Sequence, residues 1–467
     1  MSEYVIELSK YFICGLMVLY TLSSFYAFRY AGTVGNRPVY IIQNILMFMI
    51  QTICFVNLVL VTRADYTTAL SLSLDQETNG STVNQGLLYL FLFGFVEIFL
   101  LAVVFLVPVI YEKCNRLLLN NMCMLLGIGL MMISRLSYSR AIKQYVIVLI
   151  SLIISLFIPY IFSKVRFLKK MTWLYAAVGI ACLSAVLILG QTTHGSNISV
   201  EIAGLTFQPS EFVKILFIFF LAGALWEDNS FLRVAITAVL AGIHVIVLVL
   251  STDLGGALIF FIAYVLVVFV ATGNYLYILA GAAGGSAAAL MAYRLFSHVR
   301  IRVLAWQDPW SYIDDQGWQI TQSLFAVGSG SWFGMGLLKG DPTKIPFVSA
   351  DCIFSSICEE LGVIFGVCLI MVCVSCFIAI MQIALRIHDR FYQLIVYGIG
   401  TMYIFQIFLT VGGGIKFIPL TGVTLPFISY GGSSIMSTMF MFFIIQGIYI
   451  RLQEEGVRRH ADDGTEE

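Results

Sequence analysis

An aspartate that directly precedes a long apolar run is the residue in this chain best suited to acid–base chemistry. Asp351 stands just before the apolar segment 354–384, which is long enough to cross a bilayer. A carboxylate that is partly withdrawn from water at the outer mouth of a cavity is a natural general base. We therefore predict a catalytic role for Asp351, with simple capping of the following helix as the alternative.

Two adjacent glutamates inside the same apolar run form a second candidate group. Glu359 and Glu360 lie about two turns after Asp351, and ionisable residues within apolar runs are energetically costly. Asp351, Ser355 and Glu359 are spaced by four residues, so they can lie on one helical face. We expect at least one glutamate to serve the site, unless a hydrogen-bonded network satisfies both.

An acid and a base that can pair lie in the segment 207–214. Ser210 and Glu211 follow a proline, which indicates a helix start with a negative charge near the positive end of the helix dipole. Glu211 and Lys214 are three residues apart and can form an ion pair on one face. The pair either closes an interfacial helix end or lines an outer cavity, and we include Gln208 in the candidate site.

A further acid connects two apolar segments that have almost no loop between them. Asp253 stands in Ser-Thr-Asp-Leu-Gly-Gly, between the apolar runs 232–250 and 255–272. It either caps the second helix through the amides of its first turn or faces the same cavity as Glu211.

The connection 294–353 is 60 residues long and rich in Trp, Asp, Gln and Gly. Long ordered loops usually carry function, and aromatic residues beside polar ones suit a sugar or a lipid head group. The candidates here are Gln319, Gln322 and Ser323. The glycines at 327–336 permit a tight backbone path, but no Walker lysine follows them. Packing of the aromatic residues within the loop is the alternative.

An irregular segment precedes the last apolar run. Residues 418–434 contain two prolines, several glycines and several hydroxyl side chains. A broken segment that lines a cavity tolerates such a backbone, whereas a purely structural loop is the alternative. We select Ser429, Tyr430 and Ser433 as candidates, and Lys416 just before the segment as a possible phosphate contact.

Membrane helices must position these residues, because 60% of the 467 residues are hydrophobic and only 11% are charged. Soluble domains carry roughly 45–50% apolar and 25% charged residues, so a secreted, cytosolic or disordered protein is excluded. The net charge of zero gives no support for nucleic-acid binding. We predict an all-α polytopic membrane protein with thirteen spans near 8–28, 39–62, 86–111, 117–136, 144–163, 172–190, 211–227, 232–250, 255–272, 275–293, 354–384, 391–411 and 435–450.

The predicted spans divide into a three-span N-terminal extension, 1–116, and a ten-span core, 117–453, followed by a solvated tail, 454–467. With the C-terminus in the cytoplasm and the N-terminus outside, the basic cluster Lys164–Lys170 falls on a short inside connection, as the positive-inside rule requires. The same orientation makes 294–353 a large extracytoplasmic loop and places Asp351 at the outer face.

Five sequence blocks in order make the chain resemble the SEDS family of shape, elongation, division and sporulation proteins, the relatives of FtsW, RodA and SpoVE. The blocks are FQPSE-x-x-K, DLG, the DP…GWQ…QS-x-x-A-x-GSG…G-x-G loop, D-x-IF…EELG and PLTG…LPF-x-SYGGSS. They cover roughly residues 117–451. The resemblance implies a ten-span core with both ends of that core in the cytoplasm, leaving three additional helices at the N-terminus.

The resemblance also implies an activity. Family members resembling this chain are peptidoglycan polymerases that use lipid II at the outer face of the bacterial cytoplasmic membrane. They act in division, elongation or sporulation with a class B penicillin-binding protein. Asp351 matches the family's essential aspartate and would deprotonate the acceptor hydroxyl of the nascent glycan strand. That hydroxyl attacks the anomeric carbon of the donor and expels undecaprenyl diphosphate, while a divalent cation (Mg or Mn) or a basic residue stabilises the leaving group.

The chain departs from the family pattern at three places. Ile198 and Ser199 stand where many members have an Arg-Trp pair, Phe347 and Ala350 replace a Glu and a Thr before the aspartate, and Thr410 replaces an Asn. Two other functions therefore stay open. One is a transporter that moves the lipid-linked precursor, for which ionisable residues deep within spans are expected. The other is a non-catalytic scaffold that recruits a penicillin-binding protein.

Overall fold

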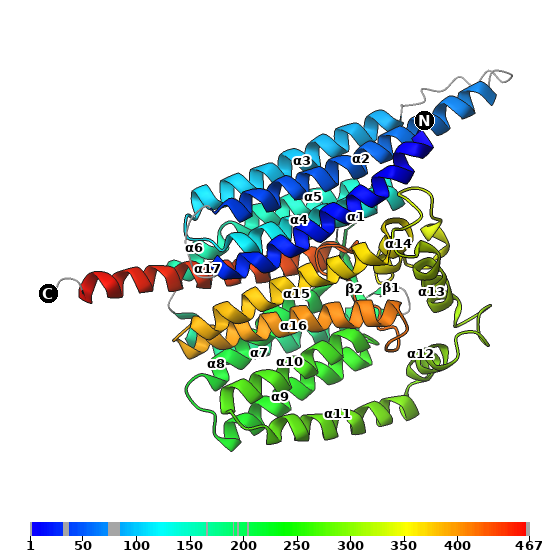
Figure 1. Cartoon of the computed structure of the whole chain (residues 1–467). Helices are drawn as coiled ribbons and strands as arrows, with labels where there is room; N and C mark the ends of the chain where they lie inside the picture. The colour runs from blue at the N-terminus through cyan, green and yellow to red at the C-terminus, as the bar shows by residue number, and fades with distance from the viewer. Residues whose placement is uncertain are drawn as a thin grey trace.

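The protein is a bundle of long helices in the computed structural model (Figure 1). The structure describes residues 2–30, 37–72, 85–164, 167–189, 191–193, 196–202 and 205–463. Within these residues, twelve helical segments are long and apolar enough to cross a membrane, which confirms the predicted polytopic all-α class. They are formed by α1 (Ser2–Tyr26), α2 (Pro38–Leu72), α3 (Gln85–Ile110), α4 (Arg116–Leu136), α5 with α6 (Tyr138–Ser155 and Ile158–Lys164), α7 (Thr172–Leu189), α9 (Phe231–Leu250), α10 (Leu254–Thr272), α11 (Leu276–Leu295), α15 (Val363–Arg386), α16 (Arg390–Gly414) and α17 (Gly432–Asp463).

The predicted count of thirteen spans is not confirmed, because the segment expected at 211–227 forms a shorter helix. This helix, α8 (Pro209–Leu225), has 17 residues. At 1.5 Å per residue it extends about 26 Å, at the short end of the roughly 17–25 residues of transmembrane helices. It packs against α7, α10, α16 and α17, and most of its side chains are buried by protein. It begins after Gln208, whose amide donates to Ser433 Oγ at one end of the bundle, and it ends at Trp226 beside Lys169 at the other. The helix therefore runs between the two ends of the bundle while protein covers most of it.

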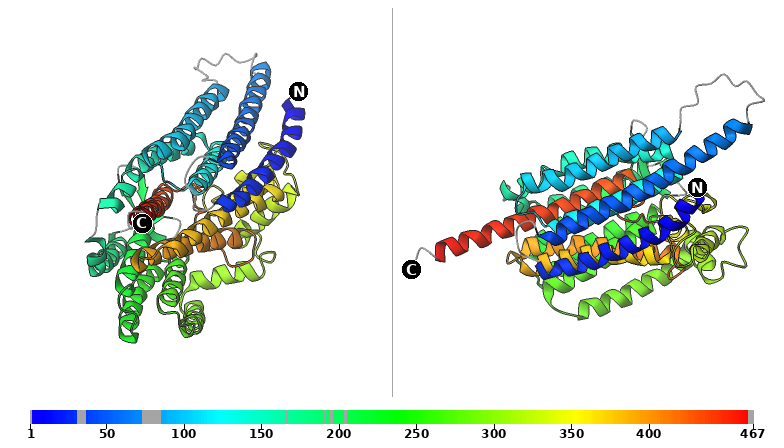
Figure 2. Two further views of the ribbon diagram at one scale, coloured as in Figure 1. Left: turned by 60° about the vertical axis from the view of Figure 1, so that its left-hand side comes forward. Right: turned by 45° about the horizontal axis from the view of Figure 1, so that its top comes forward.

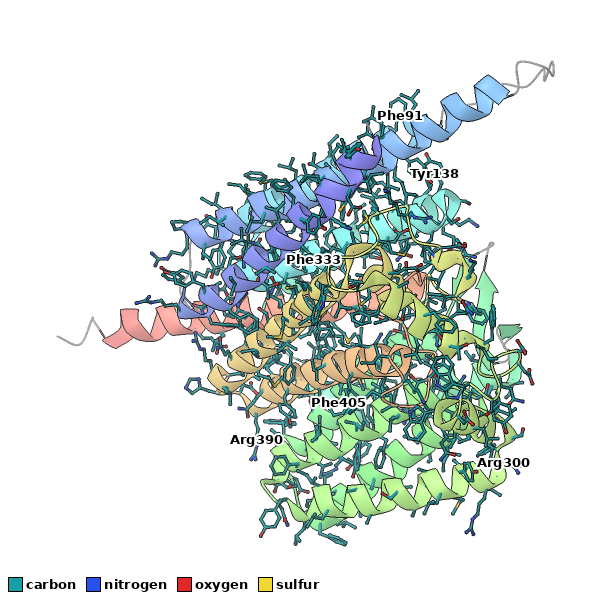
Figure 3. The ribbon with its side chains drawn as sticks, turned by 45° about the vertical axis from the view of Figure 1, so that its right-hand side comes forward. Phe91, Tyr138, Arg300, Phe333, Arg390 and Phe405 are labelled. Carbon is teal, nitrogen blue, oxygen red and sulfur yellow. The ribbon has the colours of Figure 1, made fainter. Side chains whose placement is uncertain are left out.

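The N-terminal helices α1–α3 form one side of the bundle and are joined to the remainder by polar contacts (Figure 1). Tyr20 Oη and Ser24 Oγ on α1 each donate a hydrogen bond of 3.1 Å to Asn121 Oδ1 on α4. Asn121 Nδ2 donates to Ser375 Oγ on α15 at 3.2 Å. The ring of Phe333 lies 5.0 Å from that of Tyr11 on α1, centroid to centroid, and Figure 3 shows Phe333 beside that helix. The extension is thus packed closely against the core.

The predicted single span 354–384 is instead two helices, α14 (Ile353–Leu361) and α15, separated at Gly362. Gly362 has φ 91° and ψ 162°, a backbone conformation that is essentially restricted to glycine. The chain 331–336 supplies backbone hydrogen bonds at the break. Val363 N donates to Ser331 O at 3.0 Å and Met335 N donates to Glu359 O at 2.9 Å. The break is therefore stabilised from outside the helix, a condition for irregular backbone in a membrane protein.

The long connection before α14 and the small sheet before α8 lie at one end of the bundle, which we call the Asp351 end (Figure 1). The long connection contains α12 (Ser297–Gln307), α13 (Trp318–Gly330) and the 3-10 helix η3 (Pro342–Lys344), and Figure 3 shows Arg300 of α12 at this end. A small antiparallel sheet of β1 (Gln191–Thr193), β2 (Ser196–Ile202) and β3 (Leu205–Phe207) was not predicted. Strands of three to seven residues are too short for a clear alternation signal.

The chain ends lie at opposite ends of the bundle (Figures 1 and 2). The N-terminus is at the Asp351 end, and α17 projects beyond the bundle at the other. The predicted tail begins within α17, which continues to Asp463. Residues 464–467 lie outside the described residues.

Candidate active site

Asp351 is held at the Asp351 end by backbone contacts on the residues before it. It follows a series of turns after η3, and α14 begins two residues later at Ile353. Tyr430 N donates to Ser349 O at 2.7 Å, and Ser429 Oγ donates to Ala350 O. Two of the candidates from the irregular segment 418–434 therefore fix the backbone that carries Asp351.

The Asp351 carboxylate is buried, with 8% of the residue exposed, and has one side-chain hydrogen-bond donor among the described residues. Gln319 Nε2 on α13 lies 3.3 and 3.2 Å from its two oxygens. Burial raises the pKa of Asp351 to about 6, against the opposing effects of nearby backbone amides, Gln319 and Arg302. The carboxylate is therefore ionised at neutral pH and basic enough to accept a proton.

Arg302 interacts electrostatically with two acids of the site, Asp351 and Asp253, and was not selected from the sequence. Burial lowers the pKa of its guanidinium, while Asp351 and Asp253 act in the opposite direction. Its Nη1 donates to the carbonyl oxygens of Leu420 and Thr421, at 3.2 and 3.0 Å. A signal existed in the sequence, because Arg302 precedes Trp306 by four residues. Both side chains extend from one face of α12, Arg302 to the irregular segment and Trp306 to the chain just before it, where Trp306 Nε1 donates to Lys416 O at 3.1 Å.

Asp253 caps α10, as one of its two predicted roles required. Its Oδ1 accepts from Gly256 N at 2.8 Å. Burial raises the pKa of Asp253, and Glu211 acts in the same direction, whereas Lys214 and Arg302 oppose it. The cap therefore also belongs to a group of charges that extends from Asp351 through Arg302 to α8.

Glu211 and Lys214 form a buried ion pair of 2.7 Å near the start of α8. Ser437 Oγ on α17 donates to Glu211 Oε2 at 3.1 Å. Lys214 Nζ donates to Gln406 Oε1 on α16 at 2.9 Å, and Gln406 Nε2 donates to Thr424 O at 3.0 Å. The pair is thus connected through Gln406 to the same irregular segment that contacts Arg302 and the backbone just before Asp351.

The partners of the two glutamates of α14 are different from the partner of Asp351. Glu360 Oε1 is ion-paired with Arg135 Nη2 on α4 at 2.8 Å and accepts from Leu338 N at 3.2 Å. Glu359 Oε1 accepts from Asp341 N at 2.9 Å. Asp351, Ser355 and Glu359 do not share one helical face, because α14 begins only after Asp351. The glutamates anchor the chain 338–341.

The remaining candidates support the same end of the molecule. Ser323 Oγ is 2.5 Å from Ser355 Oγ and donates to Gly414 O at 2.7 Å. Ser433 Oγ accepts from Gln208 N at 2.9 Å, and Gln208 Nε2 donates to Ser210 Oγ at 3.1 Å. Gln322 is half-buried beside Ser323. Lys416 lies near Asp308. Two hydrogen bonds from Ser311 are the main cause of the lowered pKa of Asp308, and the charge of Lys416 lowers it further.

A protein-built metal site is not found among the described residues. No three of their His, Cys, Asp and Glu side chains come together in a way that could hold a metal ion. Asp351 and Asp253 each have a partner of their own, Gln319 and the Gly256 amide. The described residues therefore do not fit a resident metal centre.

Comparison with known proteins agrees with this geometry. The family model FTSW_RODA_SPOVE, described as cell cycle protein, matches residues 115–454. The chain belongs to this family. A peptidoglycan glycosyltransferase RodA of Mycobacterium tuberculosis is 30% identical over 403 residues, covering 80% of this chain and 84% of the relative. A probable peptidoglycan glycosyltransferase FtsW of Alcanivorax borkumensis is 32% identical over 297 residues, covering 60% of this chain and 75% of the relative.

Solved structures share the fold of this FtsW/RodA/SpoVE family member. A chain from a peptidoglycan synthase complex that coordinates polymerization and crosslinking superimposes with a TM-score of 0.63 at 24% identity, covering 73% of this chain and 98% of the other. The rod shape determining protein RodA of Thermus thermophilus gives a TM-score of 0.53 at 22% identity, covering 72% and 96%. At these identities the likeness concerns the fold alone.

Proposed function

We propose that this family member is a peptidoglycan glycosyltransferase that extends glycan strands from lipid II. The observation that carries the proposal is the Asp351 carboxylate, which is buried, raised in pKa to about 6, and placed near the guanidinium of Arg302. The curated relatives bear the name peptidoglycan glycosyltransferase, and Asp351 has the properties that a general base needs at neutral pH.

The chemistry assigned to Asp351 is the removal of a proton from the acceptor sugar hydroxyl. As the hydroxyl oxygen bonds to the anomeric carbon of the donor, the bond from that carbon to the diphosphate breaks, and the electron pair leaves with undecaprenyl diphosphate. Attack from the side opposite the leaving group inverts the anomeric carbon. Gln319 orients the carboxylate, and Arg302 offers a positive charge near the developing negative charge.

The leaving diphosphate needs positive charge, and Arg302 and Lys416 are basic candidates at this end of the molecule. Arg302 donates to the carbonyl oxygens of Leu420 and Thr421, and Trp306 donates to the backbone carbonyl of Lys416. A divalent cation would enter with the diphosphate, since Mg²⁺ is commonly bound by substrate phosphates and one or two carboxylates. No step assigned to the residues above depends on such a cation.

The proposal includes the orientation of the protein in the membrane and its partner protein. The C-terminal end of the bundle is the cytoplasmic one in this proposal, because Lys164, Lys169, Lys170 and Arg386 lie on short connections there. The Asp351 end and the N-terminus then face outward. A class B penicillin-binding protein is the proposed partner, which the structural similarity to a chain of a polymerizing and crosslinking complex supports.

One experiment tests the activity directly. The full chain, purified with its crosslinking partner and supplied with lipid II and divalent cation, should form glycan polymer that is resolved by gel electrophoresis. Asp351→Ala should reduce polymer by about 100- to 10,000-fold, whereas Asp314→Ala, at an exposed acid of the same loop, should retain it. Absence of polymer with the wild type contradicts the enzyme, and equal polymer from Asp351→Ala removes Asp351 from the role of base.

A further inference from the structure

Glu97 is an acid in the middle of α3, a helix of the N-terminal extension that is otherwise uncharged. It is the thirteenth of the 26 residues of this helix. At 1.5 Å per residue, it lies about 18 Å from either end of α3, and therefore near the middle of the span. An ionisable residue inside a span is energetically costly and almost always has a partner.

The carboxyl group of Glu97 has no partner among the described residues. Its Oε1 is buried without a hydrogen bond, and no other described residue forms a hydrogen bond or an ion pair with it. The residue as a whole is half-buried, so the carboxyl group lies at the boundary between the packed helices and the lipid.

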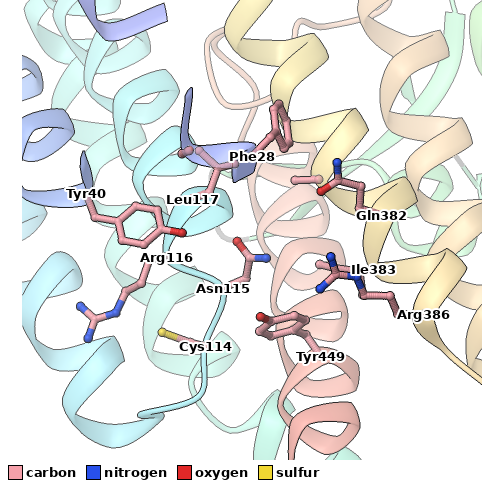
Figure 4. A pocket seen from close by; sticks show the side chains of 12 residues that line it. Phe28, Tyr40, Cys114, Asn115, Arg116, Leu117, Gln382, Ile383, Arg386 and Tyr449 are labelled. Atoms are coloured by element: carbon pink, nitrogen blue, oxygen red, sulfur yellow. The ribbon is translucent and has the colours of Figure 1, made fainter. Parts of the chain in front are cut away.

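The helices that pack against α3, which are α2, α4 and α5, do not supply the missing charge. α2 has no Lys or Arg from Pro38 to Leu60, and the two bases of α5 lie in its first two turns. α4 carries Arg116 and Arg135 in its first and last turns. Arg116 is at the end of the bundle opposite to Asp351, beside Tyr40 and a small pocket (Figure 4), and Arg135 is paired with Glu360. No described base is close enough to act on the Glu97 carboxyl.

The side of α3 that carries Glu97 is open to the membrane. This helix lies at the outer edge of the bundle (Figures 1 and 2), and Leu90 and Leu101 on the same side are exposed. Gly94 lies between them, three residues before Glu97, and nothing lies within 4 Å of its Cβ position. Small residues allow membrane helices to approach each other closely. We call Leu90, Gly94, Glu97 and Leu101 the Glu97 face.

We propose that the Glu97 face binds a transmembrane helix of a partner protein that carries a lysine or arginine within its own span. The backbone of that helix approaches α3 at Gly94, and its ammonium or guanidinium group pairs with the Glu97 carboxylate. Such a charge-assisted pair satisfies both groups at once inside the membrane. The partner contributes a membrane helix, because the unpaired acid lies in the middle of a span. This binding is independent of the proposed activity.

The test uses the full chain in liposomes with two synthetic leucine–alanine transmembrane peptides, which differ only in a central lysine or leucine. Energy transfer between the labelled chain and a labelled peptide measures their association. The wild type should bind the lysine peptide about 5- to 30-fold more tightly than the leucine peptide, as expected for polar contacts between membrane helices. Glu97→Leu should remove this preference and Gly94→Leu should reduce it, whereas Ile98→Leu, at an exposed neighbouring position, should retain it.

The thermal unfolding midpoint separates a docking role of Glu97 from a structural one. Glu97→Leu should unfold at a temperature no lower than the wild type, because no described residue pairs with Glu97. A clearly lower midpoint would contradict the proposal, since it would show that the carboxyl group is satisfied within the chain. If Glu97→Leu does not fold, Glu97→Gln keeps the shape of the side chain, and the preference for the lysine peptide should fall with the loss of charge.

Three binding results would also overturn the proposal. The first is equal binding of the two peptides by the wild type. The second is a preference for the lysine peptide that persists in Glu97→Leu and in Glu97→Gln. The third is association of two differently labelled copies of the chain that is lost in Glu97→Leu, which would assign the Glu97 face to a second copy of this chain.

Discussion

Asp351 and Glu360 are buried carboxylates only nine positions apart in the sequence, yet their surroundings differ. Glu360 is ion-paired with Arg135 at 2.8 Å and accepts a backbone amide. Asp351 has the Gln319 amide at 3.2 Å and the charge of Arg302, but Arg302 donates to the carbonyl oxygens of Leu420 and Thr421. One carboxylate is neutralised by a direct partner, and the other is not.

This difference separates a structural acid from a reactive one. Burial raises the pKa of both carboxyls, to about 7 for Glu360 and about 6 for Asp351, so the direct partner and not the pKa distinguishes them. The ion pair of Glu360 holds α14 and α4 together, whereas Asp351, without a direct cation, remains available to take a proton. The four predictions that follow test this contrast, beginning with the largest expected effect.

Replacing Glu360 by Gln should destabilise the protein by about 3–5 kcal/mol, because it leaves Arg135 buried without its counter-charge. The measurement is thermal or denaturant unfolding of the full chain in detergent. Glu455→Gln, which removes an ion pair of 2.9 Å with Arg451 at a much more exposed position, should cost less than about 1 kcal/mol. Similar losses for the two variants would contradict the structural role assigned to Glu360.

Replacing Asp351 by Asn should act in the opposite direction and stabilise the fold by up to about 3 kcal/mol at pH 8. The pKa of Asp351 in the folded protein is about 6, against an ordinary value of 3.8, and each unit corresponds to about 1.4 kcal/mol. The folded wild type therefore loses stability as the pH rises from about 4 to above 6, and the asparagine variant should lack this loss. Unfolding midpoints of both proteins at pH 5 and pH 8 measure the effect; a variant that is less stable than the wild type at pH 8 would break the contrast with Glu360.

Substitution of Gly362 by Ala should destabilise the helix break by about 1–3 kcal/mol, the usual cost of a strained backbone conformation. An added Cβ would lie 2.4 Å from Trp332 O. Because the break determines where Glu360 and the chain 338–341 sit, polymerase activity should fall together with stability. Gly284→Ala on α11 is the control, since nothing lies within 4 Å of its Cβ position; an equal effect there would deny the break any special role.

Removing the Gln319 amide should shift the pH dependence of activity. Asp351 loses its basic form as the pH falls through about 6, so the acid limb of kcat/KM should lie near that pH. Gln319→Leu removes a hydrogen bond to the carboxylate form, which raises the pKa further and should move the limb upward by up to about one unit. A limb that stays in place in this variant would show that another group controls it.

Most of the fold could be predicted from the sequence because hydropathy reports burial in lipid directly. The same measure could not show that protein surrounds α8, since its residues are apolar whether lipid or protein surrounds them. It also could not detect the break at Gly362, because a glycine inside an apolar run does not reveal its φ angle. Asp351 was selected from its position before an apolar run, and its partner Gln319 from the composition of the long loop.

The pairing of charges was the part that sequence reasoning could not resolve. Arg135 and Glu360 are separated by 225 residues, and Arg302 reaches an irregular segment more than a hundred residues later. Nothing local to Glu360 distinguishes it from Asp351, since both are acids next to the same apolar run. Only the three-dimensional packing shows which of them has a direct cationic partner.

The contacts of α1 also determine the order in which its faces can become buried during synthesis. Asn121 is made about a hundred residues after Tyr20 and Ser24, but Cys14 Sγ and Thr21 Oγ1 donate to carbonyl oxygens 347 residues further on, in α14 and α15. At about 5–20 residues per second, that interval lasts about 17–70 s. Throughout it, the face of α1 that finally packs against α15 must meet lipid or the insertion machinery, so this face is covered only long after α1 itself is made.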